Sequence, residues 1–175
     1  DATIAKLGEG VKKPKVLIIG AGGRCGHGAA EIYERHGAEI TRWDWEDTID
    51  IDRDAVADHD IMINCAFIKS KGSPFIRKED LKASARLSIV TDVGCDPFSD
   101  FNPVPIYNEP TSWDKAYIKI DGEGGKSVDL AKPQFGIWFW TMPTNWQAML
   151  RPVRPLMFES LISVMRLRSQ ISVVP

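Results

Sequence analysis

The sequence lacks several features that mark particular classes of protein. It has no run of ~20 apolar residues that could cross a bilayer as a helix, and its 22 basic and 24 acidic residues leave a net charge of only −2. We therefore expect neither a membrane nor a nucleic acid among its partners. Its three cysteines are an odd number without the spacing of metal ligands, so we expect no metal site.

The chain begins with Asp1 rather than Met, and no signal-peptide pattern follows. We expect it to be a cytoplasmic piece of a longer protein. With 175 residues, 43% of them apolar and 26% charged, it has the size and composition of one globular domain. We also expect it to be a monomer.

A glycine-rich turn after the first strand-like run is the most informative part of the sequence. The run Lys15–Ile19 is followed by Gly20, Gly22 and Gly23. Gly20 permits a tight turn, and a glycine at position 22 or 23 removes the Cβ atom that would block a pyrophosphate. This pattern is typical of a dinucleotide-binding turn.

A helical pattern over Arg24–His36 follows the turn, and Gly37 is well placed to end it. Gly26 and Gly28 would let this helix pack closely on the sheet. The N-terminus of such a helix directs N–H groups and the positive end of the helix dipole at phosphates.

A second strand-like run, Glu39–Asp44, ends in an acidic residue. The Asp44 carboxylate can accept hydrogen bonds from ribose hydroxyls and would repel a 2′-phosphate, which favours NAD over NADP. The order of strand, turn, helix, strand and acid predicts an α/β fold with a doubly wound parallel sheet, the Rossmann arrangement, and NAD as cofactor. The alternative is such a fold whose glycine turn binds nothing, or binds another phosphate ligand.

The rest of the body alternates strand and helix, with one unit abridged. Residues 45–59 are too few for the usual helix, strand and helix, so we expect a single short turn of helix over Arg53–Ala57. The other predicted elements are strands over Asp60–Phe67, Ser88–Val93 and Ala116–Ile120, a short helix over Arg77–Ser84 and a turn over Asp121–Gly125.

A shift in composition near Leu130 predicts a boundary. Residues 131–175 hold five basic residues and one acid, five of the 11 prolines and three of the six tryptophans. We predict a connecting segment over 1–14, an NAD-binding domain over 15–130 and an atypical tail over 131–175. Leu156–Leu167 has the pattern of a short amphipathic helix. The tail is either a segment that docks a partner or, as we expect, a non-native terminus.

Two cysteines follow strands that we expect to be neighbours. In a doubly wound sheet of order 3-2-1-4, the runs 15–19 and 60–67 lie side by side and end at the same edge. Cys25 and Cys65 could then come within bonding reach. We expect free buried thiols rather than a lasting disulfide, with Cys25, at a helix N-terminus, as the readier thiolate.

Four segments resemble the NAD-binding domain of saccharopine dehydrogenase, an NAD-dependent, lysine-forming enzyme. They are KVLIIGAGGRCGHGA (15–29), RWDWEDT (42–48), DIMINCAFIKSKGSPF (60–75) and IVTDVGCDPFSDFNPVPIY (89–107). A more distant similarity relates the chain to the NAD domains of alanine dehydrogenase and transhydrogenase. The resemblance implies oxidative cleavage of saccharopine to lysine and 2-oxoglutarate, with NAD accepting hydride. Nothing after about Leu130 resembles the family.

The resemblance also implies which residues hold the cofactor. The predicted cofactor-binding residues are Gly20, Gly22, Gly23, Arg24, Gly26, Asp44, Thr48, Phe67 and Val93. Gly23 and Arg24 would contact the pyrophosphate and Asp44 the adenosine ribose. Alternatively, Arg24 is a solvated residue of the first helical turn.

The remaining positions are assigned to the two ends of the cofactor. The resemblance places Thr48 near the adenine, and Phe67 and Val93 along the cleft toward the nicotinamide. Alternatively, Thr48 is an ordinary loop residue, and Phe67 and Val93 belong to the core.

We expect no catalytic residue in this chain. In the family the lysine and histidine that transfer protons lie in an N-terminal substrate domain, which this sequence lacks. His36 and His59 are expected to be solvated, while His27 lies beside the glycine turn and could approach a phosphate. Asp96, just beyond a strand, fits a turn position better than a catalytic one.

Three functions therefore stay open. The first is the cofactor-binding portion of a saccharopine dehydrogenase, inactive alone, which would meet saccharopine, or lysine and 2-oxoglutarate, only with the missing domain. The second is an NAD domain of the alanine dehydrogenase type. The third is a non-catalytic dinucleotide-binding module whose tail binds a partner.

Overall fold

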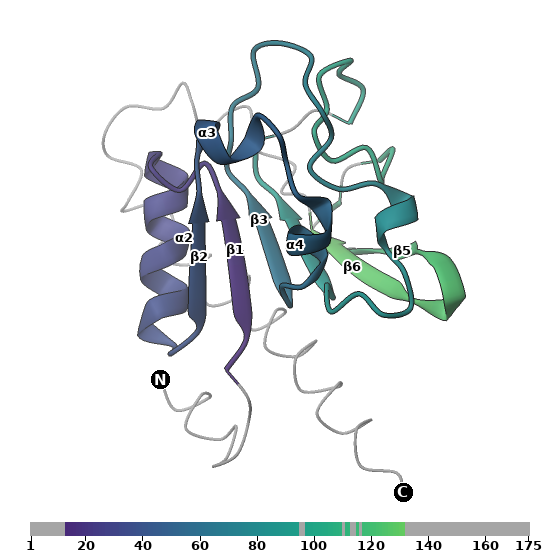
Figure 1. Ribbon diagram of the computed structural model, residues 1–175, viewed down its shortest axis with the longest axis horizontal. Helices are drawn as coiled ribbons and strands as arrows, with labels where there is room; N and C mark the ends of the chain where they lie inside the picture. The colour runs from purple at the N-terminus through teal and green to yellow at the C-terminus, as the bar shows by residue number, and fades with distance from the viewer. Residues whose placement is uncertain (1–12, 95–96, 110, 113–114, 116, 132–175) are drawn as a thin grey trace, which may run out of the picture. The chain divides into compact units, whose positions relative to one another are not determined.

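A six-stranded, mostly parallel sheet forms the centre of the part of the chain that the computed structural model describes, residues 13–94, 97–109, 111–112, 115 and 117–131. Its strands lie in the order β2-β1-β3-β4-β6-β5, and β5 runs antiparallel to β6 (Figure 1). The strands are β1 (Lys15–Ile19), β2 (Glu39–Trp43), β3 (Ile61–Asn64), β4 (Ile89–Asp92), β5 (Ile118–Asp121) and β6 (Ser127–Ala131).

The direction of winding reverses between β1 and β3. The chain passes from β1 to β2 on one side of β1 and then crosses to β3 on the other side. Ile19, the last residue of β1, is level with Trp43 of β2 and Asn64 of β3, so the carboxyl ends of these strands meet at one edge. The predicted doubly wound sheet and the predicted adjacency of β1 and β3 are confirmed.

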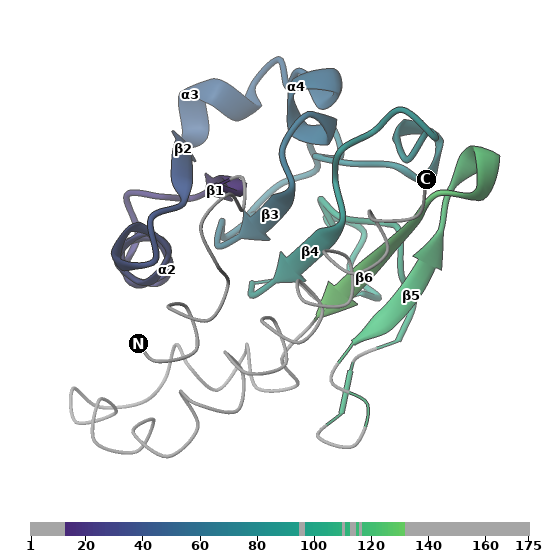
Figure 2. The same ribbon diagram turned by 90° about the horizontal axis from the view of Figure 1, so that it is seen from below.

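The two faces of the sheet are covered by different elements. The helix α2 (Arg24–Arg35) lies on one face and the short helix α4 (Arg53–Ala57) on the other (Figure 2). Residues 16–19 of β1 are 0% exposed, as expected of a parallel strand between two layers. The main apolar core joins alternate strand residues to Val56 of α4 and to Phe75 and Leu81 of the β3–β4 connection.

The packing of α2 on the turn before it depends on one glycine. A Cβ atom at Gly26 would lie 2.3 Å from the carbonyl oxygen of Gly20 and 2.6 Å from Cα of Ala21. Both are backbone atoms, which cannot move aside as a side chain can. A Cβ atom at Gly28 would meet nothing within 4 Å, so the expectation of close packing was right for Gly26 and wrong for Gly28.

The predicted helix over Arg77–Ser84 is wrong. Only a 3-10 turn, η1 (Lys78–Asp80), forms there. The carbonyl oxygen of Leu81 accepts a hydrogen bond from the N–H group of Glu123 (2.8 Å), in the turn η2 (Glu123–Gly125) that joins β5 and β6. Leu81 itself has φ −81° and ψ 61°, which is not a helical conformation, so the helix does not continue past η1.

Two other elements were not predicted. The strand β6 follows η2, with Val128 and Leu130 buried and the residues between them half-buried. The one-turn helix α3 (Trp45–Thr48) begins directly after β2. It is stabilised by Asp44, whose N–H group donates to Asp47 Oδ2 (2.8 Å). The short helix predicted over Arg53–Ala57 is confirmed as α4.

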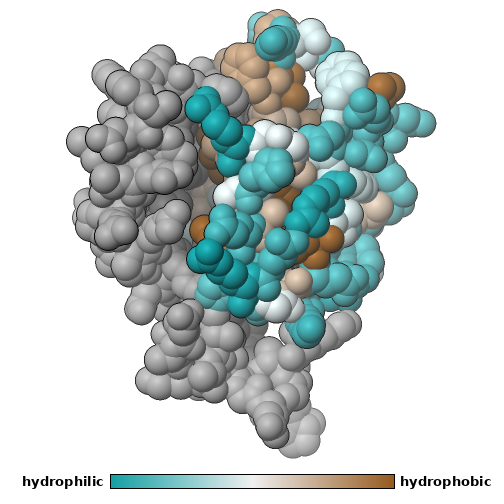
Figure 3. Space-filling view, turned by 90° about the vertical axis from the view of Figure 1, so that its left-hand side faces the viewer, coloured by the Kyte–Doolittle hydropathy of each residue, from teal (hydrophilic) through white to brown (hydrophobic). Residues whose placement is uncertain are grey.

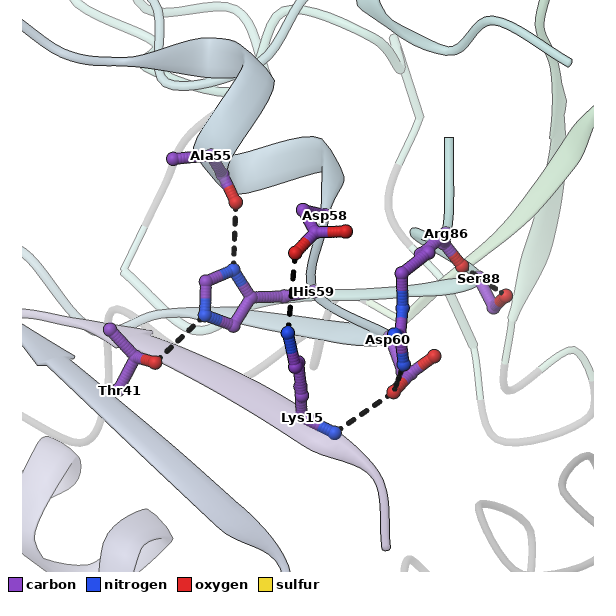
Figure 4. A network of polar contacts seen from close by, with 8 residues as sticks. All are labelled: Lys15, Thr41, Ala55, Asp58, His59, Asp60, Arg86 and Ser88. Carbon is purple, nitrogen blue, oxygen red and sulfur yellow. Dashed lines mark hydrogen bonds and ion pairs between the residues drawn. The ribbon is translucent and has the colours of Figure 1, made fainter. Parts of the chain in front are cut away.

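A polar cluster ties the strands together at the amino edge of the sheet (Figure 4). Asp60 Oδ2 accepts from the backbone N–H group of Lys15 (2.9 Å) and from Arg86 Nη2 (2.6 Å). This hydrogen bond raises the pKa of Arg86. Lys15 Nζ lies 3.3 Å from Asp58 Oδ2 and lowers the pKa of Asp58.

His59 belongs to the same cluster, and its expected solvation was wrong. The ring is half-buried, with Nδ1 2.8 Å from the carbonyl oxygen of Ala55 and Nε2 2.8 Å from Thr41 Oγ1 (Figure 4). Because Ala55 offers only an acceptor, Nδ1 carries the proton. The residue joins α4 to β2 rather than standing in solvent.

Within the described ranges, no helix has both the length and the apolar character needed to cross a membrane. The predicted helix over Leu156–Leu167 lies outside the residues that the structure describes.

The two glycines of α2 form a matched pair for a stability test. We expect Gly26→Ala to lower the free energy of unfolding by about 1–3 kcal/mol, because the added methyl group meets fixed backbone. We expect Gly28→Ala to raise it by about 0.5–1 kcal/mol, because alanine favours a helix and the site is open. Urea unfolding followed by circular dichroism measures both. Equal stabilities of the two variants would contradict the packing described here.

Candidate dinucleotide-binding site

The glycine turn lies at the carboxyl edge of the sheet, where the winding reverses. Gly20 has φ +80°, a conformation that glycine adopts readily and other residues rarely do. The N–H groups of Gly20 and Ala21 both donate to the carbonyl oxygen of Trp43 (2.8 and 3.1 Å). A Cβ atom at Gly20 would lie 2.7 Å from the backbone nitrogen of Ala66. The turn is thus fitted between the ends of β2 and β3, as predicted for Gly20.

The outer part of the turn presents backbone to solvent at the start of α2. Gly22, Gly23 and Arg24 are exposed. No side chain caps the helix at Gly23, and its first turn contains no acidic residue. Because the first N–H groups of a helix lack partners inside it, this end of α2 is suited to an anion. Arg24 adds a positive charge at the same place.

Asp44 links the glycine turn to the end of β2. Its two carboxylate oxygens each lie 3.1 Å from the backbone nitrogen of Gly22. A Cβ atom at Gly22 would lie 3.1 Å from Asp44 Oδ2, so a side chain here would crowd that carboxylate. Asp44 is exposed and keeps lone pairs for further donors. The structure therefore brings together the residues predicted for phosphate and for ribose.

Thr48 lies on α3, one turn beyond Asp44, and its hydroxyl is engaged locally. Its Oγ1 donates to the carbonyl oxygen of Trp45 (2.9 Å). Trp45 is 69% exposed and Ile49 67% exposed, so α3 presents two large apolar side chains beside Asp44. Sequence reasoning missed Trp45, although the signal was present: an aromatic residue directly follows the acid.

Apolar side chains are also visible from the side of the molecule that carries α2 and β2. This side is largely hydrophilic, and a group of apolar side chains lies at its upper end (Figure 3). That end carries α3 and the carboxyl ends of the strands in Figure 1.

Phe67 and Val93 follow β3 and β4 at the same edge. Phe67 is 61% exposed, which excludes the alternative that it belongs to the core, and Lys69 Nζ lies 5.9 Å from the centre of its ring. Val93 is half-buried, and its N–H group donates to the carbonyl oxygen of Asn64 (2.9 Å). A Cβ atom at Gly94 would lie 2.7 Å from the carbonyl oxygen of Ala66. The backbone after β3 is therefore closely confined.

A buried polar network lies beneath these residues and was not predicted. Asp92 and Asn64, the last residues of β4 and β3, are both 0% exposed. Asn64 Nδ2 donates to Asp92 Oδ1 (2.9 Å), and the Tyr107 hydroxyl donates to Asp92 Oδ2 (2.6 Å). The sequence signal was a polar residue at the end of each of two apolar strands.

Two of the cysteines are free thiols in the structure. Cys25 and Cys65 are both half-buried, and the N–H group of Cys65 donates to the carbonyl oxygen of Ile19 (2.8 Å). Burial raises the pKa of Cys25, although Arg24 acts in the opposite direction. Burial raises the pKa of Cys65 to about 12, with smaller contributions from Cys25 and Asp92. The larger rise in pKa at Cys65 leaves Cys25 as the readier thiolate of the two, as predicted.

The other candidate residues take no part in a catalytic arrangement. His27 is exposed on α2, and His36 is half-buried, with Nδ1 2.6 Å from the carbonyl oxygen of Ile32. Asp96 lies outside the described residues. Within the described part of the chain, no three His, Cys, Asp or Glu side chains are grouped to hold a metal ion. The site is suited to binding an extended phosphate ligand, with a carboxylate beside the glycine turn.

Comparison with known proteins gives one consistent result. No protein-family model matches the chain. It is 39% identical over 115 residues to the saccharopine dehydrogenase [NAD(+), L-lysine-forming] of Emericella nidulans, covering 62% of this chain and 31% of that protein. It is 39% identical over 132 residues to the same-named protein of Candida glabrata, covering 71% and 35%. For that of Neurospora crassa the identity is 37% over 135 residues, covering 70% and 36%.

The chain spans about a third of the length of the curated relatives that it matches. The fold agrees with the Rossmann arrangement that the motifs predict. The chain is homologous to one part of the NAD-dependent, L-lysine-forming saccharopine dehydrogenases.

Proposed function

We propose that residues 15–130 are the NAD-binding domain of an NAD-dependent saccharopine dehydrogenase, with residues 1–14 as a connecting segment. The observation that carries the proposal is the contact between the Asp44 carboxylate and the N–H group of Gly22, 3.1 Å from each oxygen. This contact joins an acceptor for ribose hydroxyls to a turn suited to phosphate. It lies at the carboxyl edge of the sheet where the winding reverses between β1 and β3, which is where dinucleotides bind in this fold.

The residues at this edge fit a dinucleotide. The exposed backbone of Gly22 and Gly23 would lie beneath the pyrophosphate, and the uncapped end of α2 and Arg24 would supply N–H groups and positive charge. Gly20 and Gly26 let the turn and the start of α2 pack closely, because a Cβ atom at either position would meet protein backbone. Asp44 would accept hydrogen bonds from the adenosine ribose.

The two ends of the cofactor would lie on opposite sides of the turn. On the side of β2, the exposed Trp45 offers an aromatic face to the adenine, with Thr48 behind it as part of α3. On the side of β3 and β4, Phe67 and Val93 would flank the nicotinamide. NAD supplies a hydride acceptor when it is bound.

The residues of this domain orient the cofactor but do not move protons in the proposed reaction. That reaction converts saccharopine, NAD and water to lysine, 2-oxoglutarate and NADH, and it needs a base within hydrogen-bond reach of the substrate amine. His59 is engaged in the cluster at the opposite edge of the sheet. The proton-transfer groups are therefore proposed to lie in the two thirds of the relatives that this chain does not cover.

We expect the chain to bind NAD more tightly than NADP, because the Asp44 carboxylate accepts from ribose and repels a 2′-phosphate. Asp44→Asn keeps an oxygen for the Gly22 N–H group but removes the charge. It should weaken NAD binding about tenfold and abolish the preference over NADP. Asp44→Ala, which loses both contacts, should cost about 1–3 kcal/mol of NAD binding.

Calorimetric titration with both cofactors measures these changes. Asp50→Asn, which removes an exposed acid from the same acidic segment, is the matched control and should leave both affinities unchanged. Equal or tighter binding of NADP by the unaltered chain would contradict the assignment of Asp44.

A second prediction concerns the adenine. Trp45→Ala should weaken the binding of AMP and NAD by about 1–3 kcal/mol, the range measured for stacking of a base on an aromatic side chain, while Trp45→Phe should retain most of it. Tyr117→Ala removes an exposed aromatic side chain near β5 and serves as control. An unchanged AMP affinity in Trp45→Ala would exclude Trp45 from the adenine site.

A third prediction concerns activity. The purified 175-residue chain should bind NAD yet produce no NADH from saccharopine, because we propose that the base for the substrate amine lies in the part of the relatives that this chain does not cover. Absorbance at the NADH band over a long incubation measures this. Sustained, chain-dependent NADH formation would show that the chain holds its own proton-transfer group, and Lys69 and Asp96 would be the residues to replace first.

A further inference from the structure

We propose that Asp92 is a positioning residue of the dinucleotide site. Its buried carboxylate holds the end of β3 and the segment carrying Tyr107 in one arrangement, and so sets the position of the Ala66 peptide beside the glycine turn. The inference rests on the proposed function and adds a residue to which neither the motifs nor the comparisons assign a role.

Both oxygens of the Asp92 carboxylate are engaged by donors from other parts of the chain. Asn64 Nδ2 lies 2.9 Å from Oδ1, and the Tyr107 hydroxyl lies 2.6 Å from Oδ2. Asp92 and Asn64 are 0% exposed, and Tyr107 is 7% exposed. A buried carboxylate is costly unless it is hydrogen-bonded, so these donors must keep their positions. Asp92 thus joins β4, β3 and the loop that follows β4.

The carboxylate also determines which way the Asn64 amide faces. An ionised carboxylate only accepts hydrogen bonds, so the amide must turn its NH2 group toward Asp92. The amide oxygen of Asn64 then faces the other way and accepts from the N–H group of Ala66 (3.1 Å). A hydrogen-bonded chain runs from Tyr107 through Asp92 and Asn64 to the backbone of Ala66.

The Ala66 peptide is closely confined on two sides. Its nitrogen would lie 2.7 Å from a Cβ atom at Gly20, and its carbonyl oxygen 2.7 Å from a Cβ atom at Gly94. The Ala66 peptide therefore fits between the glycine turn and the start of the loop after β4. A small displacement of this peptide would carry with it the exposed Phe67, which follows it directly in the chain.

The consequence differs for the two halves of the cofactor. The adenosine half would lie toward β2, against Asp44, whose carboxylate accepts from the N–H group of Gly22 on that side of the turn. The nicotinamide half would lie toward β3 and β4, above Ala66 and Phe67. Loss of the network should therefore weaken binding of the nicotinamide half and spare the adenosine half.

The amino edge offers a matched control. Asp60 also joins two strands and a loop through one carboxylate, since it accepts from the backbone of Lys15 and from Arg86 (Figure 4). It lies at the opposite end of β3 from Asn64. Asp60→Asn should disturb the sheet in a similar way without reaching the proposed site.

The experiment compares Asp92→Asn, Tyr107→Phe and Asp60→Asn in the full 175-residue chain. Asp92→Asn places an NH2 group opposite one of the two donors, the Asn64 amide or the Tyr107 hydroxyl. Tyr107→Phe is the milder variant, because it removes one donor and leaves the carboxylate in place. Calorimetry gives the affinities for NAD and for ADP. Hydrogen exchange gives the protection of the Ala66 N–H group in the free chain, a readout that needs no cofactor.

We expect Asp92→Asn to weaken NAD binding about tenfold, to change ADP binding less than about twofold, and to accelerate exchange at Ala66 about tenfold. Tyr107→Phe should act in the same direction to a smaller extent, and it carries the test if Asp92→Asn does not fold. Asp60→Asn should alter neither the NAD-to-ADP ratio nor the exchange at Ala66.

Unchanged exchange at Ala66 would overturn the proposed link to Asp92. Faster exchange with an unchanged ratio of NAD to ADP affinity would overturn the positioning role and leave a structural network. Failure of the unaltered chain to bind NAD or ADP would overturn the proposed function, and with it the site that Asp92 is inferred to position. Hydrogen exchange at the Ala66 N–H group needs no cofactor, so it tests the link from Asp92 to Ala66 whether or not the chain binds NAD.

Discussion

The close approach of Gly20 to the backbone after β3 is the constraint on which the rest of the site depends. Gly20 has φ +80°, and a Cβ atom added to it would lie only 2.7 Å from the Ala66 nitrogen. Only a residue without a side chain fits at this position. The same turn leaves no room for a Cβ atom at Gly26, so α2 begins directly on it. The end of β2 is joined to the turn twice, through the carbonyl oxygen of Trp43 and through the Asp44 carboxylate. A side chain at Gly20 would therefore displace the phosphate turn, the ribose acceptor and the start of α2 together.

Polar side chains at the two ends of the strands serve different purposes. At the amino edge, Asp58 and Asp60 pair with Lys15 and Arg86 in partly exposed ion pairs, which contribute modestly to stability in water. At the carboxyl edge, the Asp92 carboxylate is fully buried and engaged by uncharged donors. Loss of either donor would leave an oxygen of this buried carboxylate without a hydrogen bond, which costs free energy. Burying this carboxylate costs free energy, and its hydrogen bonds hold the backbone of the carboxyl edge in one position. Such an arrangement is expected where a ligand binds.

The sequence predicted the parts of the fold that depend on neighbouring residues. The glycine turn, the acid after β2 and the apolar strands each have a local signature, and together they predicted the strand order around β1. The elements that were wrong or missed depend on distant contacts. The helix expected over Arg77–Ser84 is limited to η1, since Leu81 leaves the helical conformation and bonds to the distant Glu123. His59 is engaged because α4 approaches β2. The Asp92 network could not be predicted from spacing, since its partners lie 28 and 15 residues away along the chain.

The central claim is that a dinucleotide lies across the carboxyl edge of the sheet, over the glycine turn. Backbone amide chemical shifts of the isotope-labelled chain, recorded during titration with NAD, test it most directly. The account predicts that the largest changes fall on Gly22, Asp44, Phe67 and Gly94, which surround this edge, and that Lys15 and Asp60 at the opposite edge change little. Shifts concentrated at Lys15 and Asp60, or no saturable shift at Gly22, would contradict it.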